Sequence, residues 1–121
     1  MQIRESAEMY LETILVLSEK GAVRSIDIAR AMNFSRPSVS VTVHNLEAEN
    51  YIKIADNGNI TLEPKGREIA ESIYERHNVL SKLLMDIGVS EETATNDACK
   101  MEHVISEETF NCIKKHIAEH H

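Results

Sequence analysis

Three residues near the end of the chain, Cys99, Glu102 and His103, carry the side chains best suited to chemistry. Their i, i+3, i+4 spacing would place a thiol, a carboxylate and an imidazole on one face of a helix. Each group is a good ligand for a divalent transition metal, and one thiolate among nitrogen and oxygen donors favours iron or the metals after it. Three ligands on one helix make an incomplete site. The alternative interpretation is a solvated polar face with an incidental cysteine.

Two earlier segments contain side chains that could complete such a site. Met9 and Glu12 project away from the apolar stripe of a helix predicted over residues 5–19, about 60° apart at ~100° per residue. Either could also be an ordinary surface residue, because single exposed apolar side chains are common. His77 lies within the apolar stripe of a long predicted helix, where a core histidine is the alternative to a metal ligand.

The second cysteine and the last histidines are given no role. Cys112 has apolar neighbours along the chain, which indicates a buried core thiol. Histidines near the end of a chain are usually solvated, and this applies to His116, His120 and His121. Two cysteines in a chain without a secretion signal are expected to be free thiols or ligands rather than a disulfide.

Composition limits the class of protein. The 121 residues are 42% hydrophobic and 4% aromatic, enough for an aliphatic core in one small unit or two closely packed subdomains. No apolar run approaches a membrane span and no signal pattern is visible, so a cytoplasmic location is expected. The net charge of −7 argues against strongly electrostatic DNA binding. Most of the excess acid lies in residues 63–121, where a bound cation would offset some of it.

Elements that could bind DNA are predicted before residue 63. After the first helix, a short helix through Ala31 is expected to begin with Ser25 as its N-cap, and Asn33 suits a left-handed turn. Ser35 would cap a third helix that holds Pro37 in its first turn. This third helix would bury Val39, Val43 and Leu46 and present a mostly polar face outward. Ser38, Val41 and Asn45 lie on that face, with His44 beside them. This arrangement is typical of a helix-turn-helix.

The rest of the chain is predicted as a hairpin followed by helices. Residues 51–55 and 59–62 flank Asp56-Asn57-Gly58, which suits a tight turn and predicts a small two-stranded wing. A long helix is expected from Pro64 to about residue 87. Ser90 would cap a fifth helix that runs through about Val104, and a sixth would begin at Ser106.

Several segments together resemble the diphtheria-toxin repressor and manganese transport regulator family of bacterial metal-dependent repressors. Ser6-Ala-Glu-Met-Tyr-Leu-Glu-Thr-Ile is similar to the family's first helix. Asp27-Ile-Ala-Arg-Ala-Met and Ser35-Arg-Pro-Ser-Val-Ser are similar to its helix-turn-helix. Asn96-Asp-Ala-Cys-Lys-Met-Glu-His-Val is similar to its metal-binding helix. The resemblance covers nearly the whole chain.

The resemblance implies a mainly α protein of two domains. Residues 1–63 would form a winged helix-turn-helix DNA-binding domain with a small two-stranded wing, and residues 64–121 an all-helical metal-binding and dimerisation domain. The family's optional SH3-like third domain is expected to be absent. The implied principal metal site is formed by Met9, Cys99, Glu102 and His103, as in the iron-responsive branch. Glu12 and His77 fall where the manganese-responsive branch also places ligands.

The function implied is a homodimeric repressor of metal homeostasis that binds a near-palindromic double-stranded DNA operator. Neither a membrane nor a small-molecule substrate is expected among its binding partners. Fe²⁺ is the expected metal because thioether and thiolate ligands are soft, with Mn²⁺, Co²⁺, Ni²⁺ or Zn²⁺ as alternatives. The expected DNA contacts are Ser35, Arg36, Pro37, Ser38, Val41, Thr42, Asn45 and Lys53.

Three alternatives remain at this point. They are a winged-helix regulator not gated by metal, a manganese-responsive member of the same family, and a small metal-dependent hydrolase. The hydrolase would need an open coordination position and a general base in a concave pocket. Nothing beyond Glu12 suggests such a substrate site, so the chain is predicted not to be an enzyme.

Overall fold

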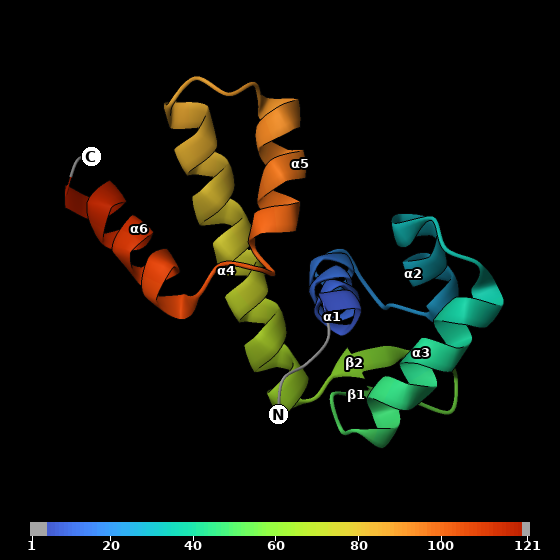
Figure 1. The fold of residues 1–121 in the computed structure, drawn as a ribbon. Helices are drawn as coiled ribbons and strands as arrows, with labels where there is room; N and C mark the ends of the chain where they lie inside the picture. The colour runs from blue at the N-terminus through green and yellow to red at the C-terminus, as the bar shows by residue number, and fades with distance from the viewer. Residues whose placement is uncertain (1–4, 120–121) are drawn as a thin grey trace. The chain divides into compact units, whose positions relative to one another are not determined.

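A computed structural model describes residues 5–119 (Figure 1). The chain forms two compact units, one ending at Glu71 and the other beginning at Ser72. The long helix α4 (Pro64–Asp86) contributes residues to both units. The boundary placed between residues 63 and 64 from the sequence stays a prediction. His120 and His121 lie outside the described residues. Within the described range, no helix has the length and apolar character needed to cross a bilayer.

Three helices build the core of the first unit: α1 (Glu5–Ser18), α2 (Ser25–Met32) and α3 (Arg36–Ala48). α1 packs against α2, and α2 packs against α3. Their inward side chains are fully buried and include Leu11, Ile14, Ile28, Val39 and Val43. The succession of α2, a short turn and α3 is the helix-turn-helix predicted from the sequence.

Local hydrogen bonds set the beginning and end of α2. The backbone N–H of Arg24 donates to Oδ2 of Asp27 at 2.9 Å, and Arg24 occupies the cap position with extended backbone. The prediction of Ser25 as the N-cap was therefore wrong by one residue. Arg24 is the N-cap, and the Asp27 carboxylate in the first turn accepts the hydrogen bond from its backbone N–H. Asn33 ends α2 in the left-handed conformation, with φ of 56°, as predicted.

Ser35 is the N-cap of α3, as predicted, and its Oγ accepts from the backbone N–H of Ser38 at 3.3 Å. We expect Ser35→Ala to lower the free energy of unfolding by about 1 kcal/mol, because that N–H loses its acceptor. Urea denaturation measures the difference. Ser40→Ala, on the exposed face of the same helix, is the control and should stay within about 0.5 kcal/mol of wild type. Equal losses in the two variants would contradict the capping role.

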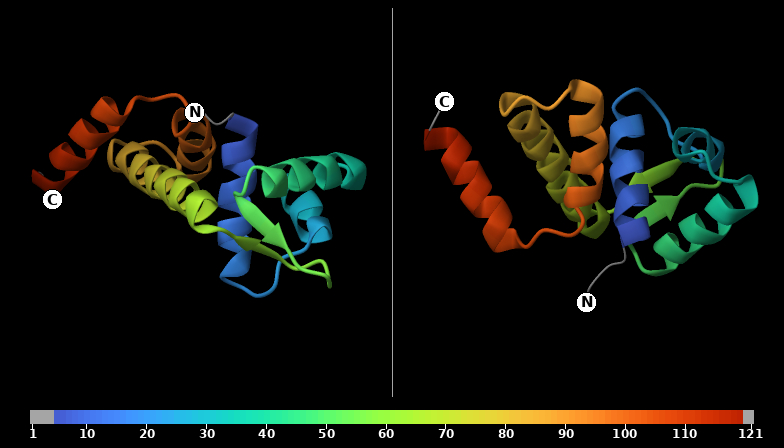
Figure 2. Two further views of the ribbon diagram at one scale, coloured as in Figure 1. Left: turned by 90° about the horizontal axis from the view of Figure 1, so that it is seen from below. Right: turned by 45° about the horizontal axis from the view of Figure 1, so that its top comes forward.

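The predicted wing is present as two antiparallel strands, β1 (Ile52–Ile54) and β2 (Ile60–Leu62). Gly58 makes the turn between them possible, because its φ of 90° suits a residue without Cβ. The backbone N–H of Ile60 donates to the carbonyl of Val23 at 2.7 Å and attaches the hairpin to the segment before α2. β2 packs against α1, and Figure 2 shows the hairpin beside this helix.

The second unit contains the rest of α4, then α5 (Glu91–Met101) and α6 (Glu107–Glu119). Ser90 and Ser106 cap α5 and α6 as predicted, each accepting from the backbone N–H three residues later. The small core of this unit consists of Ile73, Leu80, Ala94, Ala98 and Phe110.

Two predictions for the second unit were wrong. α5 ends at Met101 rather than near Val104, and residues 102–104 form a turn. Glu102 is the C-cap residue and keeps right-handed helical backbone, and its N–H donates to the carbonyl oxygen of Ala98 at 2.9 Å. Cys112 is exposed rather than a core thiol, because α6 buries Phe110 and Cys112 lies about 200° further around the helix.

Candidate metal centre and nucleic-acid interface

The Glu102 side chain is the centre of a buried polar cluster in the second unit. It is 0% exposed, although charged side chains are rarely buried unless paired. Its Oε2 lies 2.9 Å from Nδ1 of His77, and its Oε1 lies 3.4 Å from Nε2 of His103. A carboxylate only accepts hydrogen bonds, so the proton of a neutral His77 ring belongs on Nδ1. The structure thus brings together three of the predicted ligands, His77, Glu102 and His103.

Arg76 holds the turn that carries Glu102 and His103. Its Nη1 donates to the carbonyl oxygens of Glu102 at 3.2 Å and Ile105 at 2.8 Å, and its guanidinium lies 5.2 Å from the centre of the Phe110 ring. These contacts connect α4 with the α5–α6 turn and with α6. Arg76 was not among the site residues predicted from the sequence. Its position next to His77 was the only available signal.

The donor set of this cluster fits a divalent transition metal. His77, Glu102 and His103 offer imidazole nitrogens and carboxylate oxygens. Cys99 is half-buried in the last turn of α5, and the contribution of its thiol to this cluster stays a prediction. The negative charge of the buried Glu102 carboxylate would also offset part of the positive charge of a bound cation. Met9 and Glu12 lie on α1 of the first unit, and their contribution to the same site stays a prediction.

The outward face of α3 is the candidate nucleic-acid interface. Ser35, Arg36, Pro37, Ser38 and Asn45 are exposed. The Val41 side chain is 63% exposed although it is apolar, Thr42 is half-buried, and Lys53 is exposed on β1. The helical period had predicted this outward face. The assignment of these side chains to DNA stays a prediction.

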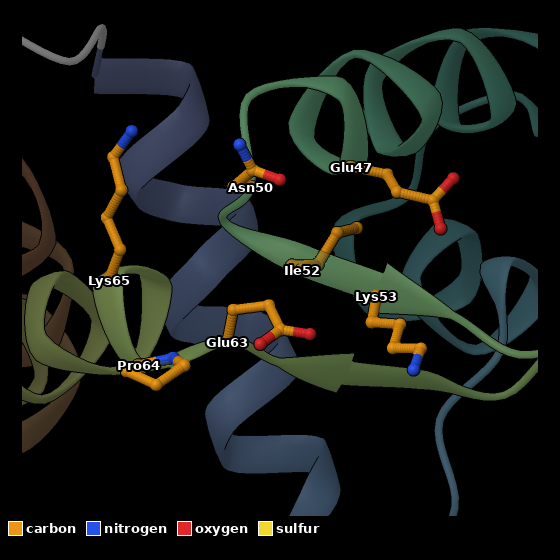
Figure 3. A pocket seen from close by; sticks show the side chains of 7 residues that line it. All are labelled: Glu47, Asn50, Ile52, Lys53, Glu63, Pro64 and Lys65. Atoms are coloured by element: carbon orange, nitrogen blue, oxygen red, sulfur yellow. The ribbon is translucent and has the colours of Figure 1, made fainter.

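Glu47, another residue that the sequence analysis missed, links α3 to the wing. Its Oε2 accepts from the backbone N–H of Ile54 at 2.8 Å, which fixes β1 relative to the end of α3. Glu47 and Lys53 also line a hollow of about 540 Å³ that extends to Lys65 at the beginning of α4 (Figure 3). The wing lysine is therefore held on the same unit as the outward face of α3.

Comparison with known proteins identifies the family. The profile described as "Iron dependent repressor, N-terminal DNA binding domain" matches residues 2–59, and "Iron dependent repressor, metal binding and dimerisation domain" matches residues 63–120. The transcriptional regulator MntR of Salmonella typhimurium is 31% identical over 118 residues, which are 97% of this chain and 75% of that protein. The chain belongs to the iron-dependent repressor family. The predicted resemblance and the predicted fold class are both confirmed.

Members similar to this chain are named for iron and for manganese. The iron-dependent repressor IdeR of Mycobacterium leprae is 37% identical over 106 residues. These are 86% of this chain and 46% of that protein, so the chain spans about half the length of this relative. The structure of the manganese regulator SloR matches with a TM-score of 0.82 and 27% identity, covering 98% of this chain and 55% of that one.

Proposed function

We propose that this chain is a homodimeric, metal-activated transcriptional repressor that binds a near-palindromic DNA operator. The observation that carries the proposal is the buried Glu102 carboxylate between His77 and His103, in a unit attached to a winged helix. Profiles named for DNA binding and for metal binding and dimerisation match the corresponding parts of the chain. Because the family is one of repressors, the metal-dependent hydrolase finds no support.

The winged helix supplies the residues for DNA recognition. The exposed face of α3 would enter the major groove, and a two-fold dimer would present two such helices about one helical turn apart. Arg36 and Lys53, both exposed, would contact phosphates. Because two side chains per protomer are proposed as phosphate contacts, we expect a modest dependence of DNA affinity on salt.

Coupling between metal and DNA would use ligands from both units. Met9 and Glu12 lie on α1, within the unit that contains α3, whereas Cys99, Glu102 and His103 follow α4. A bound divalent metal would supply coordination bonds that restrict the two units to one arrangement. His77 orients the Glu102 carboxylate, and Arg76 holds the turn on which Glu102 and His103 lie.

Selection from a pool of random double-stranded DNA tests this function without a known operator. The chain is used with Fe²⁺ under anaerobic conditions, with Mn²⁺, and with EDTA. We expect enrichment of a near-palindromic sequence with metal and none with EDTA. Equal enrichment with EDTA would favour the winged-helix regulator that is not gated by metal. No enrichment under any condition would overturn the repressor.

Fe²⁺ is the proposed physiological metal, because Met9 and Cys99 add soft donors to a site of nitrogen and oxygen ligands. We expect Met9→Asp to shift the response towards Mn²⁺, since a carboxylate is a harder ligand than a thioether. The ratio of Fe²⁺ to Mn²⁺ concentrations that give half-maximal DNA binding should change by about tenfold or more. Ser6→Asp, which adds a carboxylate at an exposed position of the same helix, is the control and should leave the ratio unchanged. An unchanged ratio in Met9→Asp would show that Met9 does not control metal choice.

A further inference from the structure

His44 is an exposed imidazole on the outward side of α3 and is not among the DNA contacts predicted above. The buried side of α3 is formed by Val39, Val43 and Leu46. At about 100° per residue, His44 lies about 130° around the helix from the middle of that side and about 60° from Val41. It therefore belongs to the face that would meet the major groove.

A hydrogen bond to the helix backbone determines what His44 presents to a ligand. Its Nδ1 lies 2.7 Å from the carbonyl oxygen of Ser40. A carbonyl oxygen can only accept, so Nδ1 carries the hydrogen and Nε2 of the neutral ring is an acceptor. The same bond draws the ring back over the preceding turn. The ring thus lies towards the N-terminal half of α3, the part of a recognition helix that contacts base edges.

We propose that His44 is a specificity-determining residue that reads the amino group of an adenine or a cytosine in the major groove. This inference rests on the proposed DNA-binding function. In the major groove, adenine N6 and cytosine N4 are the donors, whereas guanine offers the acceptors N7 and O6 and thymine offers O4 and a methyl group. An acceptor held at Nε2 therefore favours adenine or cytosine and disfavours guanine and thymine at the contacted position.

The test repeats the DNA selection with three variants, His44→Ala, His44→Gln and His44→Lys. Wild type should prefer adenine or cytosine at one position of each half-site by roughly fivefold or more. His44→Ala should lose that preference while the rest of the enriched sequence is retained. His44→Gln keeps an acceptor and should retain part of the preference. His44→Lys has only donors and should shift it to guanine.

The outcomes separate this inference from the function on which it rests. If wild type enriches no sequence with metal, the DNA-binding function itself fails. If wild type enriches a sequence and His44→Ala gives the same base frequencies at every position, His44 reads no base. If His44→Ala loses all enrichment, the comparison between His44→Gln and His44→Lys decides, and identical preferences would overturn the inference. Circular dichroism checks that each variant is folded.

Discussion

Glu102→Gln is expected to abolish the metal response while the protein remains folded. Glutamine keeps the shape of the buried side chain and its ability to accept from His77, but it removes the negative charge that a divalent cation would bind. Because Glu102 contacts both imidazoles of the cluster, we expect the affinity for Mn²⁺ and Co²⁺ to fall by about 100-fold or more. Isothermal titration calorimetry measures the affinity, and far-ultraviolet circular dichroism shows whether the fold is intact.

Thermal unfolding with and without metal provides a second readout for Glu102→Gln. At a metal concentration about 100 times the dissociation constant, wild type should gain about 2.7 kcal/mol of stability, whereas the variant should gain almost none. Cys112→Ala is the matched control, because this exposed thiol lies on α6, outside the set of proposed ligands. It should keep the full gain. A full gain in Glu102→Gln would remove this carboxylate from the ligand set.

The winged helix could be predicted because its signals act over a few residues. Ser35 caps the residue three positions later, Asn33 adopts the left-handed conformation of a helix end, and Gly58 takes the positive φ of the hairpin turn. The outward face of α3 follows from the helical period alone. In each case the interacting groups are neighbours in the sequence, so residue type and spacing were sufficient.

The end of α5 depends instead on residues far apart in the chain. The apolar periodicity of the sequence continues to Val104, yet the helix ends at Met101. Beyond that end, the Arg76 guanidinium donates hydrogen bonds to the carbonyl oxygens of Glu102 and Ile105. The contact between His77 and Glu102 spans a similar sequence distance. Residue types could nominate these side chains as ligands. Only the tertiary structure shows that they meet and that Glu102 is buried rather than on a solvated face.

Gly66 makes another contact that the sequence analysis could not foresee. It is buried in the first turns of α4, and a Cβ at this position would overlap the carbonyl oxygen of Tyr51 and lie 2.9 Å from its carbonyl carbon. That carbonyl oxygen also accepts from the backbone N–H of Glu63 at 3.0 Å. The ammonium group of Lys65 lies 4.1 Å from the centre of the Tyr51 ring. Tyr51 is therefore held from several sides and cannot easily move away.

Gly66→Ala is expected to lower the free energy of unfolding by about 2–3 kcal/mol, because the added methyl group must displace backbone rather than a flexible side chain. Alanine has a helix propensity about 1 kcal/mol better than glycine, so helix propensity alone predicts the opposite sign. Urea denaturation distinguishes the two. Glu68→Ala, exposed on the same helix, is the control and should change stability by no more than about 0.5 kcal/mol. If Gly66→Ala were as stable as wild type or more stable, the Tyr51 backbone would be able to move away from the added methyl group. The close contact between Gly66 and Tyr51 would then not contribute to the stability of the protein.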